Sequence, residues 1–345
     1  MDFNKINQIG IVGGGTSALM LCLEAAKKGI QTTLLDPQIN CVGSQAATEH
    51  MIAPITNENI QKLSLRCDVI VFNTKLDYQL KAKLHAQTYP SRELMNTLSD
   101  PKEVLDLLEE LNIPFVKTYY QDNKEEVFNT GEAFSQVEKL EFPFRFMKKY
   151  KDRVESIDIF TQEDLADFIL EIDEKADSFM IQPINTYSSI IVCPCIVDQK
   201  GNGILYEPIE EVYEENQLST IQMPASLSKT MNQKLASYNK KLLKALGMRG
   251  LVTIKYGLKP NKAVEIIEIT PAMPESAILT VHACDLSIYE QYMHVLLDVK
   301  AIPPTLLMSM TGSTTKPSIE ALEEAYHIYR LGTHALWVMA LGYDE

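Results

Sequence analysis

Apolar runs in the first hundred residues come at regular intervals and alternate with amphipathic segments. The runs at 9–12, 32–35 and 68–72 are of strand type, and the segments at 17–28 and 57–65 have the composition of helices. Strands and helices that alternate in this way predict a parallel sheet covered by helices on both faces.

The pattern changes from residue 113 onward, where short strand-like runs come with few helices. These elements predict a small α+β subdomain followed by a larger, mainly antiparallel lobe. The rest of the chain, after the last of these strands, is expected to be helical or irregular. The expected strands lie at 115–119, 144–148, 157–160, 178–182, 188–197, 251–256 and 263–269, and the expected helices at 163–170 and 232–246.

The turn after the first strand carries three glycines in a row. Its spacing from 13 to 18 fits G-x-G-x-x-G/A, in which backbone N–H groups at a helix N-terminus can bind a phosphate. An aspartate ends the next strand at about the distance expected for an acid that binds ribose. The alternative is that a tight turn between a strand and a helix favours glycine without any ligand. The residues of this candidate phosphate or substrate turn are Gly13, Gly14, Gly15, Thr16, Ser17 and Asp36.

The acidic balance of the chain narrows the choice of partners. The 345 residues carry a formal net charge of −14 at pH 7, which argues against nucleic acid or an anionic membrane as a partner. No apolar run is long enough to span a bilayer. The six cysteines are scattered, so we expect reduced, mostly buried thiols in a cytoplasmic protein.

Several strings of residues follow one another along nearly the whole chain. They are IGIVGGG at 9–15, RCDVIVF at 66–72, GLVTIKY at 250–256, VEIIEITPAMPESA at 264–277 and YEQYMHVLLDVKAIPP at 289–304. In this order they resemble the ATP-grasp superfamily and, more narrowly, the carboxyaminoimidazole ribonucleotide synthetases. These are purine-biosynthesis enzymes that use ATP and bicarbonate to carboxylate the amine of aminoimidazole ribonucleotide.

The resemblance implies a fold, a set of ligands and an assembly. ATP and Mg²⁺ would be the cofactors, a nucleotide or ribonucleotide would be the small-molecule partner, and the protein would form a homodimer. The fold would be of the mixed α/β and α+β class. Its parts would be a Rossmann-like domain at 1–98, a lid at 99–182, a large antiparallel lobe at 183–302 and a C-terminal extension packed on that lobe at 303–345.

The residues that the family places on the nucleotide are replaced in this chain. Two lysines that would bind the phosphates fall at Leu105 and Met147. Lys148 lies beside the second position but is expected on the other side of a strand. The glutamate of the adenine hinge appears as Gln182, with Ile184 in place for the ring. Lys148, Gln182 and Ile184 are therefore the candidate residues of a nucleotide cleft.

The two magnesium-binding acids of the family fall on neighbouring strands. The first position is occupied by Lys255, whereas Glu268 keeps the second. On adjacent strands these side chains are expected to form an ion pair, which would occupy the position of the metal. Glu268 is thus the one candidate metal ligand, and it faces Lys255.

These replacements leave three hypotheses for the function. The first is a relative of the synthetases with a degenerate site, which has lost ATP-dependent ligation and binds a ligand or a partner. The second is a functioning synthetase, or a ligase for another substrate, with unusual site residues. The third is a nucleotide-dependent oxidoreductase, which rests on the glycine turn and Asp36 alone.

Overall fold

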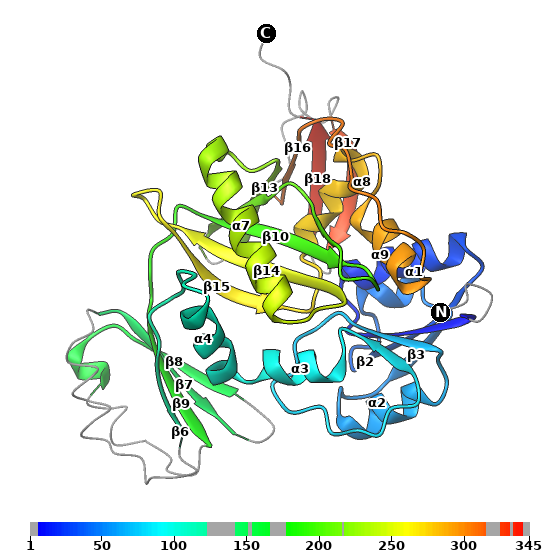
Figure 1. The fold of residues 1–345 in the computed structure, drawn as a ribbon, viewed down its shortest axis with the longest axis horizontal. Helices are drawn as coiled ribbons and strands as arrows, with labels where there is room; N and C mark the ends of the chain where they lie inside the picture. Colours follow the sequence, from blue (N-terminus) through cyan, green and yellow to red (C-terminus); the bar gives the residue numbers. More distant parts are fainter. Residues whose placement is uncertain are drawn as a thin grey trace.

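The computed structural model describes residues 6–122, 142–150, 154–165, 177–215, 217–314, 325–331 and 334–340. Within this part of the chain, three β-sheets form the framework (Figure 1). One sheet is parallel and two are antiparallel. The sequence predicts this arrangement of an α/β domain, an α+β lid and an antiparallel lobe. The predicted fold class is therefore confirmed.

The first domain is a parallel sheet with the strand order β3-β2-β1-β4-β5. Its central strands are buried and apolar, which is expected where helices cover both faces. The strands are β1 (Gln8–Val12), β2 (Gln31–Asp36), β3 (Glu49–Ile52), β4 (Val69–Phe72) and β5 (Gln87–Tyr89), and the helices are α1 (Thr16–Lys27), α2 (Asn57–Ser64) and α3 (Arg92–Ser99), with a 3₁₀ turn at Val42–Gln45.

The lid is an antiparallel sheet with the strand order β6-β9-β7-β8. One face is packed into a small core of its own that contains Phe144, Phe146, Phe179 and Ile181. The predicted strand at 115–119 is wrong for most of its length, since residue 115 makes only an isolated bridge and the strand begins at 119. The expected helix at 163–170 lies partly outside the described residues. The strands are β6 (Tyr119–Asp122), β7 (Phe144–Lys149), β8 (Val154–Ile159) and β9 (Ser178–Pro183), and α4 (Pro101–Glu110) precedes them.

The large lobe is built on the third sheet, whose main path runs β15-β14-β10-β12-β13-β16-β18-β17, with β11 paired to β10. Helix α7 (Lys229–Ala245) lies across one face, and its Leu235 and Leu242 enter the same core as Val252 and Ile254 of β14 (Figure 1). Its first strands are β10 (Ser189–Val197), β11 (Gly203–Leu205), β12 (Ile209–Glu214), β13 (Gln217–Met223), β14 (Gly250–Leu258) and β15 (Val264–Thr270).

The end of the chain differs from the prediction. Where we expected helical or irregular structure, β16 (Met310–Ser313), β17 (Ala325–Leu331) and β18 (His334–Ala340) extend the sheet of the lobe from β13. Leu336 and Val338 are buried, but the neighbours on the other face are apolar too, so the sequence shows no alternation typical of strands.

A shared core joins the first domain to the lobe. Helix α9 (Ile288–Leu296) contributes Tyr292 and Met293 to a cluster that also contains Ile9 and Leu21 of the first domain. The short segments η3 (Glu275–Leu279) and α8 (Thr280–Ala283) precede this helix. All six cysteines are free and buried. Among the described helices, none is long and apolar enough to cross a membrane.

Candidate functional site

A cleft of about 520 Å³ lies between the lid, α4 and strand β15 of the large lobe. The lid contributes the face of its sheet that is opposite its small core. Gln182 and Ile184 both line the cleft, so the structure brings these two candidate residues together. The other lining residues that matter for the chemistry are Lys75, Leu105, Thr118, Arg145, Met147, Met180, Asn185, Tyr187, Ile266 and Glu268.

Lys148 is not among the residues that line the cleft. Side chains alternate along β7, so Arg145 and Met147 face the cleft while Lys148 falls on the same side as Phe144 and Phe146 of the lid core. The expectation that Lys148 points to the other side of the strand agrees with this placement, and Lys148 is not brought together with Gln182 and Ile184.

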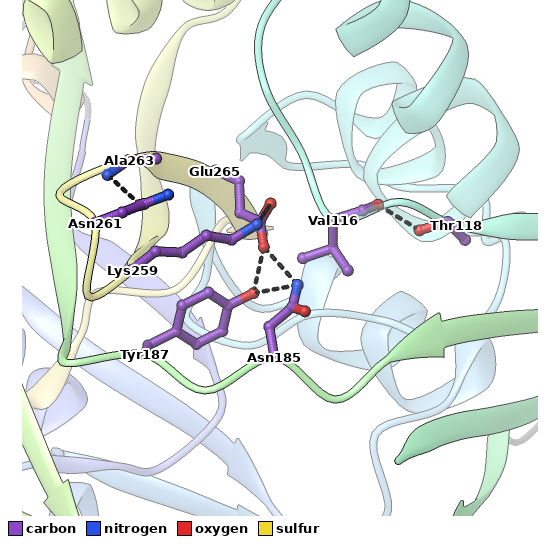
Figure 2. Close-up of polar contacts among 8 residues, drawn as sticks. All are labelled: Val116, Thr118, Asn185, Tyr187, Lys259, Asn261, Ala263 and Glu265. Carbon is purple, nitrogen blue, oxygen red and sulfur yellow. Dashed lines mark hydrogen bonds and ion pairs between the residues drawn. The ribbon is translucent and has the colours of Figure 1, made fainter. Parts of the chain in front are cut away.

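A carboxylate anchors the hinge between the lid and the lobe (Figure 2). Glu265 on β15 is 8% exposed and accepts hydrogen bonds from Asn185 Nδ2 at 2.6 Å and Tyr187 Oη at 2.8 Å. Lys259 Nζ lies 2.7 Å from the second carboxylate oxygen. Burial raises the pKa of Tyr187 and the neighbouring Glu265 raises it further, so the phenol keeps its proton at ordinary pH.

The backbone of β14 leaves room for the ring of Tyr187 only because residue 257 is glycine. A Cβ atom added at Gly257 would lie 2.2 Å from Cε1 of Tyr187, far inside van der Waals contact. The ring therefore rests on the strand itself, which fixes the hydroxyl next to Glu265. Sequence analysis missed Asn185, Tyr187 and Glu265, although an acid between Val264 and Ile266 in an apolar strand was a usable signal.

A second chain of hydrogen bonds orients Gln182. Its Nε2 donates to Thr118 Oγ1 at 2.8 Å, and the Thr118 hydroxyl donates to the carbonyl oxygen of Val116 at 2.8 Å (Figure 2 shows the second bond). The amide N–H₂ group of Gln182 is thus engaged within the protein. Its carbonyl oxygen makes no hydrogen bond to another described residue, so it remains available as an acceptor in the cleft.

The cleft offers few cations to a triphosphate, since Lys75 is the only lysine among its described lining residues. Leu105 on α4 and Met147 on β7 line it, which places apolar side chains at both expected lysine positions. Arg145 also faces the cleft, beside its register partner Gln182, and its Nε and Nη2 form two bonds to the Asp158 carboxylate at 2.6 and 2.9 Å. Such a bidentate pair neutralises the guanidinium.

The expected ion pair between neighbouring strands is present. Lys255 and Glu268 are register partners on β14 and β15, and Lys255 Nζ lies 3.0 Å from Glu268 Oε2. Burial by itself would lower the pKa of Lys255, but Glu268, Glu211 and Glu275 outweigh burial and raise it. The lysine is therefore charged and surrounded by acids.

The residues at this position do not make a suitable shell for Mg²⁺. The carboxylate of Glu268 is engaged by an ammonium group, and the described residues contain no group of three or more His, Cys, Asp or Glu side chains that could hold a metal ion. Mg²⁺ prefers several oxygen ligands in octahedral geometry. One paired carboxylate does not meet that requirement.

The glycine turn borders a separate cleft of about 270 Å³, which also contains Met273 and Glu275 of the large lobe. The turn requires glycine at its start, since Gly13 has φ of 97°. Several of its donors are already used. Gly14 N–H donates to Asp36 Oδ2 at 2.8 Å, Thr16 Oγ1 to Glu275 Oε1 at 3.3 Å and Ser17 Oγ to the Met273 carbonyl oxygen at 3.3 Å. The structure thus brings the turn residues and Asp36 together, with Asp36 bound to the turn itself.

Comparisons with known proteins identify the class. A family model described as the ATP-grasp domain matches residues 106–289, and one described as the ribonucleotide synthetase preATP-grasp domain matches residues 6–91. The first match covers more than half of the chain, so this protein belongs to the ATP-grasp family.

Within that family, the similarity is to the N5-carboxyaminoimidazole ribonucleotide synthases. The enzyme of Staphylococcus aureus is 24% identical over 96% of this chain and 85% of its own length. A solved structure of the S. aureus synthetase has a TM-score of 0.77 at 18% identity and covers 99% of this chain and 96% of that one. The Aspergillus clavatus enzyme in complex with ADP and 5-aminoimidazole ribonucleotide has a TM-score of 0.78 at 17% identity, covering 98% and 94%.

Proposed function

We propose that this protein keeps the nucleotide cleft of the purine-biosynthesis ATP-grasp ligases but has lost ATP-dependent ligation, and that it acts by binding a ligand. The observation that carries the proposal is the ion pair of Lys255 and Glu268, at 3.0 Å, at the position of the two magnesium-binding acids. The ammonium group of Lys255 occupies the carboxylate of Glu268, which is therefore not free to bind a metal ion.

The phosphate end of the cleft supports the same conclusion. Transfer of a phosphoryl group needs cations and metal ions arranged around the charge that develops in the transition state. Leu105 and Met147 supply none, and Arg145 is paired with Asp158. Losing one electrostatic donor typically costs about 3 kcal/mol of transition-state stabilisation. Several such losses in one site would bring turnover to background.

A functioning synthetase is the second candidate. The similarity over nearly the whole length of the chain favours it, as does the presence of all three sheets. An oxidoreductase has no support from the comparisons, and the Asp36 carboxylate that would bind a ribose is hydrogen-bonded to Gly14 and Gln38 N–H groups.

The decisive assay measures ADP release with ATP, Mg²⁺, bicarbonate and aminoimidazole ribonucleotide. We expect no release that depends on the ribonucleotide. Turnover of roughly 1 per second or more, the ordinary range of enzymes, would overturn the proposal in favour of a functioning synthetase. The variant Lys255→Glu provides a converse test, because metal binding that appears only in this variant would identify the lost carboxylate as the cause.

A homodimer forms part of this proposal. The first domain leaves large apolar side chains exposed that a second copy could cover, and dimers are the most common assemblies of soluble proteins. Light scattering at micromolar concentration should give twice the mass of one chain, and a mass of one chain would contradict this part of the proposal. The exposed side chains are Leu23, Ile39, Ile52 and Leu65.

A further inference from the structure

We infer that the cleft between lid and lobe binds an uncharged purine nucleoside whose base carries an exocyclic amine, in preference to a nucleoside triphosphate. This inference rests on the proposed function, since it names the class of ligand for the same cleft. It follows from the polarity of the two ends of the cleft, which are built for different ligand chemistry.

The hinge end offers hydrogen-bond acceptors. Gln182 gives its amide N–H₂ group to Thr118, and Asn185 gives its amide N–H₂ group to Glu265 at 2.6 Å. Figure 2 shows the amide oxygen of Asn185 turned away from Glu265. Each side chain therefore has its carbonyl oxygen left for a ligand, and a carbonyl oxygen selects a ligand that donates, such as an amino group.

The Glu265 cluster makes this selection rigid. If Asn185 turned its amide over, its oxygen would face the Glu265 carboxylate, and two acceptors would oppose each other in a site that is 8% exposed at Glu265. The hydroxyl of Tyr187 donates to the same carboxylate and lies 3.4 Å from Asn185 Nδ2, so it also faces the N–H₂ group of the amide. Turning the amide over would leave a partly buried hydrogen bond unmade and bring two acceptors together, so the observed orientation is strongly preferred.

The walls between the two ends suit the flat faces of a base. Ile184, Met180 and Ile266 line the cleft next to the two amides and carry no charge. A purine ring can bury its apolar faces against such side chains while its edge meets the carbonyl oxygens. The cleft volume of about 520 Å³ is within the range of small-molecule sites.

The far end of the cleft is unsuited to phosphates. Of the charged residues that line the cleft in the described part of the chain, Arg145 lies beside its register partner Gln182 and is bound to Asp158, and Glu268 is paired with Lys255. This leaves Lys75, an exposed side chain, as the unpaired charge. Phosphate oxygens placed against the neighbouring apolar side chains would lose water without gaining partners, which is strongly unfavourable.

Acids behind the ion pair add repulsion. Glu211 is 3% exposed and accepts hydrogen bonds from Ser276 Oγ at 2.5 Å and Tyr213 Oη at 2.9 Å. Together with Glu268 and Glu275 it surrounds Lys255, so the acids around this lysine outnumber it. A triphosphate extending to this position would meet a negative potential, whereas the hydroxyl groups of an uncharged ribose would not be repelled.

The test is calorimetric titration of the full-length protein with adenosine, inosine, ATP, and ATP with Mg²⁺. We expect adenosine to bind at least about tenfold more tightly than ATP, a difference of 1.4 kcal/mol in binding free energy. Mg²⁺ should not increase the affinity for ATP. Inosine, which lacks the exocyclic amine, should bind about tenfold more weakly than adenosine. The variant Asn185→Leu should lose adenosine affinity, while Asn40→Leu, at an exposed position outside the cleft, should not.

The outcomes separate this inference from the proposed function. ATP binding more tightly than adenosine, without turnover, would overturn the ligand class and leave the proposed loss of ligation standing. Mg²⁺-dependent ATP binding with turnover would overturn both. Equal affinity for adenosine and inosine, or no binding of either, would overturn the inference even if Asn185→Leu fails to fold, because both measurements use the unaltered protein.

Discussion

The two ends of the cleft differ in the interactions that their side chains make with the rest of the protein. At the hinge end, a buried Glu265 holds the partly exposed Asn185, Tyr187 and Lys259 in one cluster. At the end proposed for phosphates (the phosphate end), the apolar Leu105 and Met147 line the cleft, and Lys255 and Glu268 form a half-exposed ion pair. The hinge end supports the fold, because its polar groups depend on one another and tolerate little change.

The side chains at the phosphate end depend much less on one another. Leucine and methionine on the cleft wall need no partner, so replacing a lysine there leaves no buried group unsatisfied. The cations of such a site serve the ligand and not the fold. Leucine or methionine at such a position is therefore compatible with the fold that this chain shares with a solved synthetase over 99% of its length.

The largest effect should come from restoring charge at the phosphate end. The combined variant Leu105→Lys, Met147→Lys and Lys255→Glu adds two cations and frees a second carboxylate for a metal. We expect the affinity for ATP with Mg²⁺ to rise by about 4 kcal/mol, roughly a thousandfold, as measured by calorimetry. Asp106→Lys, on the exposed face of α4, is the control for a general charge effect. No gain over this control would show that charge is not what separates the two ends.

The next largest effect should come from removing the anchor of the hinge end. Glu265→Ala leaves Asn185, Tyr187 and Lys259 without their acceptor in a poorly solvated place. We expect the free energy of unfolding to fall by about 3 kcal/mol, measured by urea denaturation. Glu265→Gln keeps an acceptor and should lose clearly less. A loss below about 1 kcal/mol for the alanine variant would mean that the hinge end is no more structural than the phosphate end.

The sequence predicted the strands of the molecule better than the hydrogen bonds at the hinge. Strand-type runs such as 68–72 became buried parallel strands, since local apolar patterns determine which segments enter the core. The Lys255–Glu268 pair was also predicted, because the two residues lie on adjacent strands; a bulge between Lys255 and Tyr256 shifts the register by one residue and makes them direct partners. The candidate residues Gln182 and Ile184 lie in one cleft for a similar reason, as they sit two residues apart at the end of a strand.

The Glu265 cluster could not be predicted, since it joins residues about 80 positions apart. Its bonds from Asn185 and Tyr187 depend on how the hinge crosses β15, and no local pattern encodes that crossing. The same holds for the glycine turn, where Glu275 reaches Thr16 across 259 positions. Interactions of this kind follow from tertiary packing, so only the assembled fold reveals them.

A steric change at the hinge end should have an intermediate effect. Gly257→Ala puts a Cβ atom 2.2 Å from the ring of Tyr187, which must move and lose its bond to Glu265. We expect a loss of about 2 kcal/mol in urea denaturation, as is common for overpacked sites. In the double variant with Tyr187→Ala the two losses should not add, because the clash disappears with the ring. Full additivity would contradict the contact that defines this end.

The smallest effect should come from breaking the ion pair at the phosphate end. The side chains of Lys255 and Glu268 are 25% and 40% exposed, so water screens their attraction, and Lys255→Met should cost less than about 1 kcal/mol of unfolding free energy. The pKa of Lys255 is raised in the folded protein above its ordinary 10.5. Its contribution is therefore complete below pH 10.5 and disappears as the pH rises through the higher folded value.

Urea denaturation of the wild type and of Lys255→Met at several pH values measures this contribution as a difference, so that the titration of other groups cancels. The difference should be small and constant around neutral pH and should approach zero above the folded pKa of Lys255. A difference of several kcal/mol would place the pair in the same structural class as the Glu265 cluster, because only an ion pair shielded from water can contribute that much when one partner is removed. The contrast between the two ends would then lie in the ligand chemistry alone.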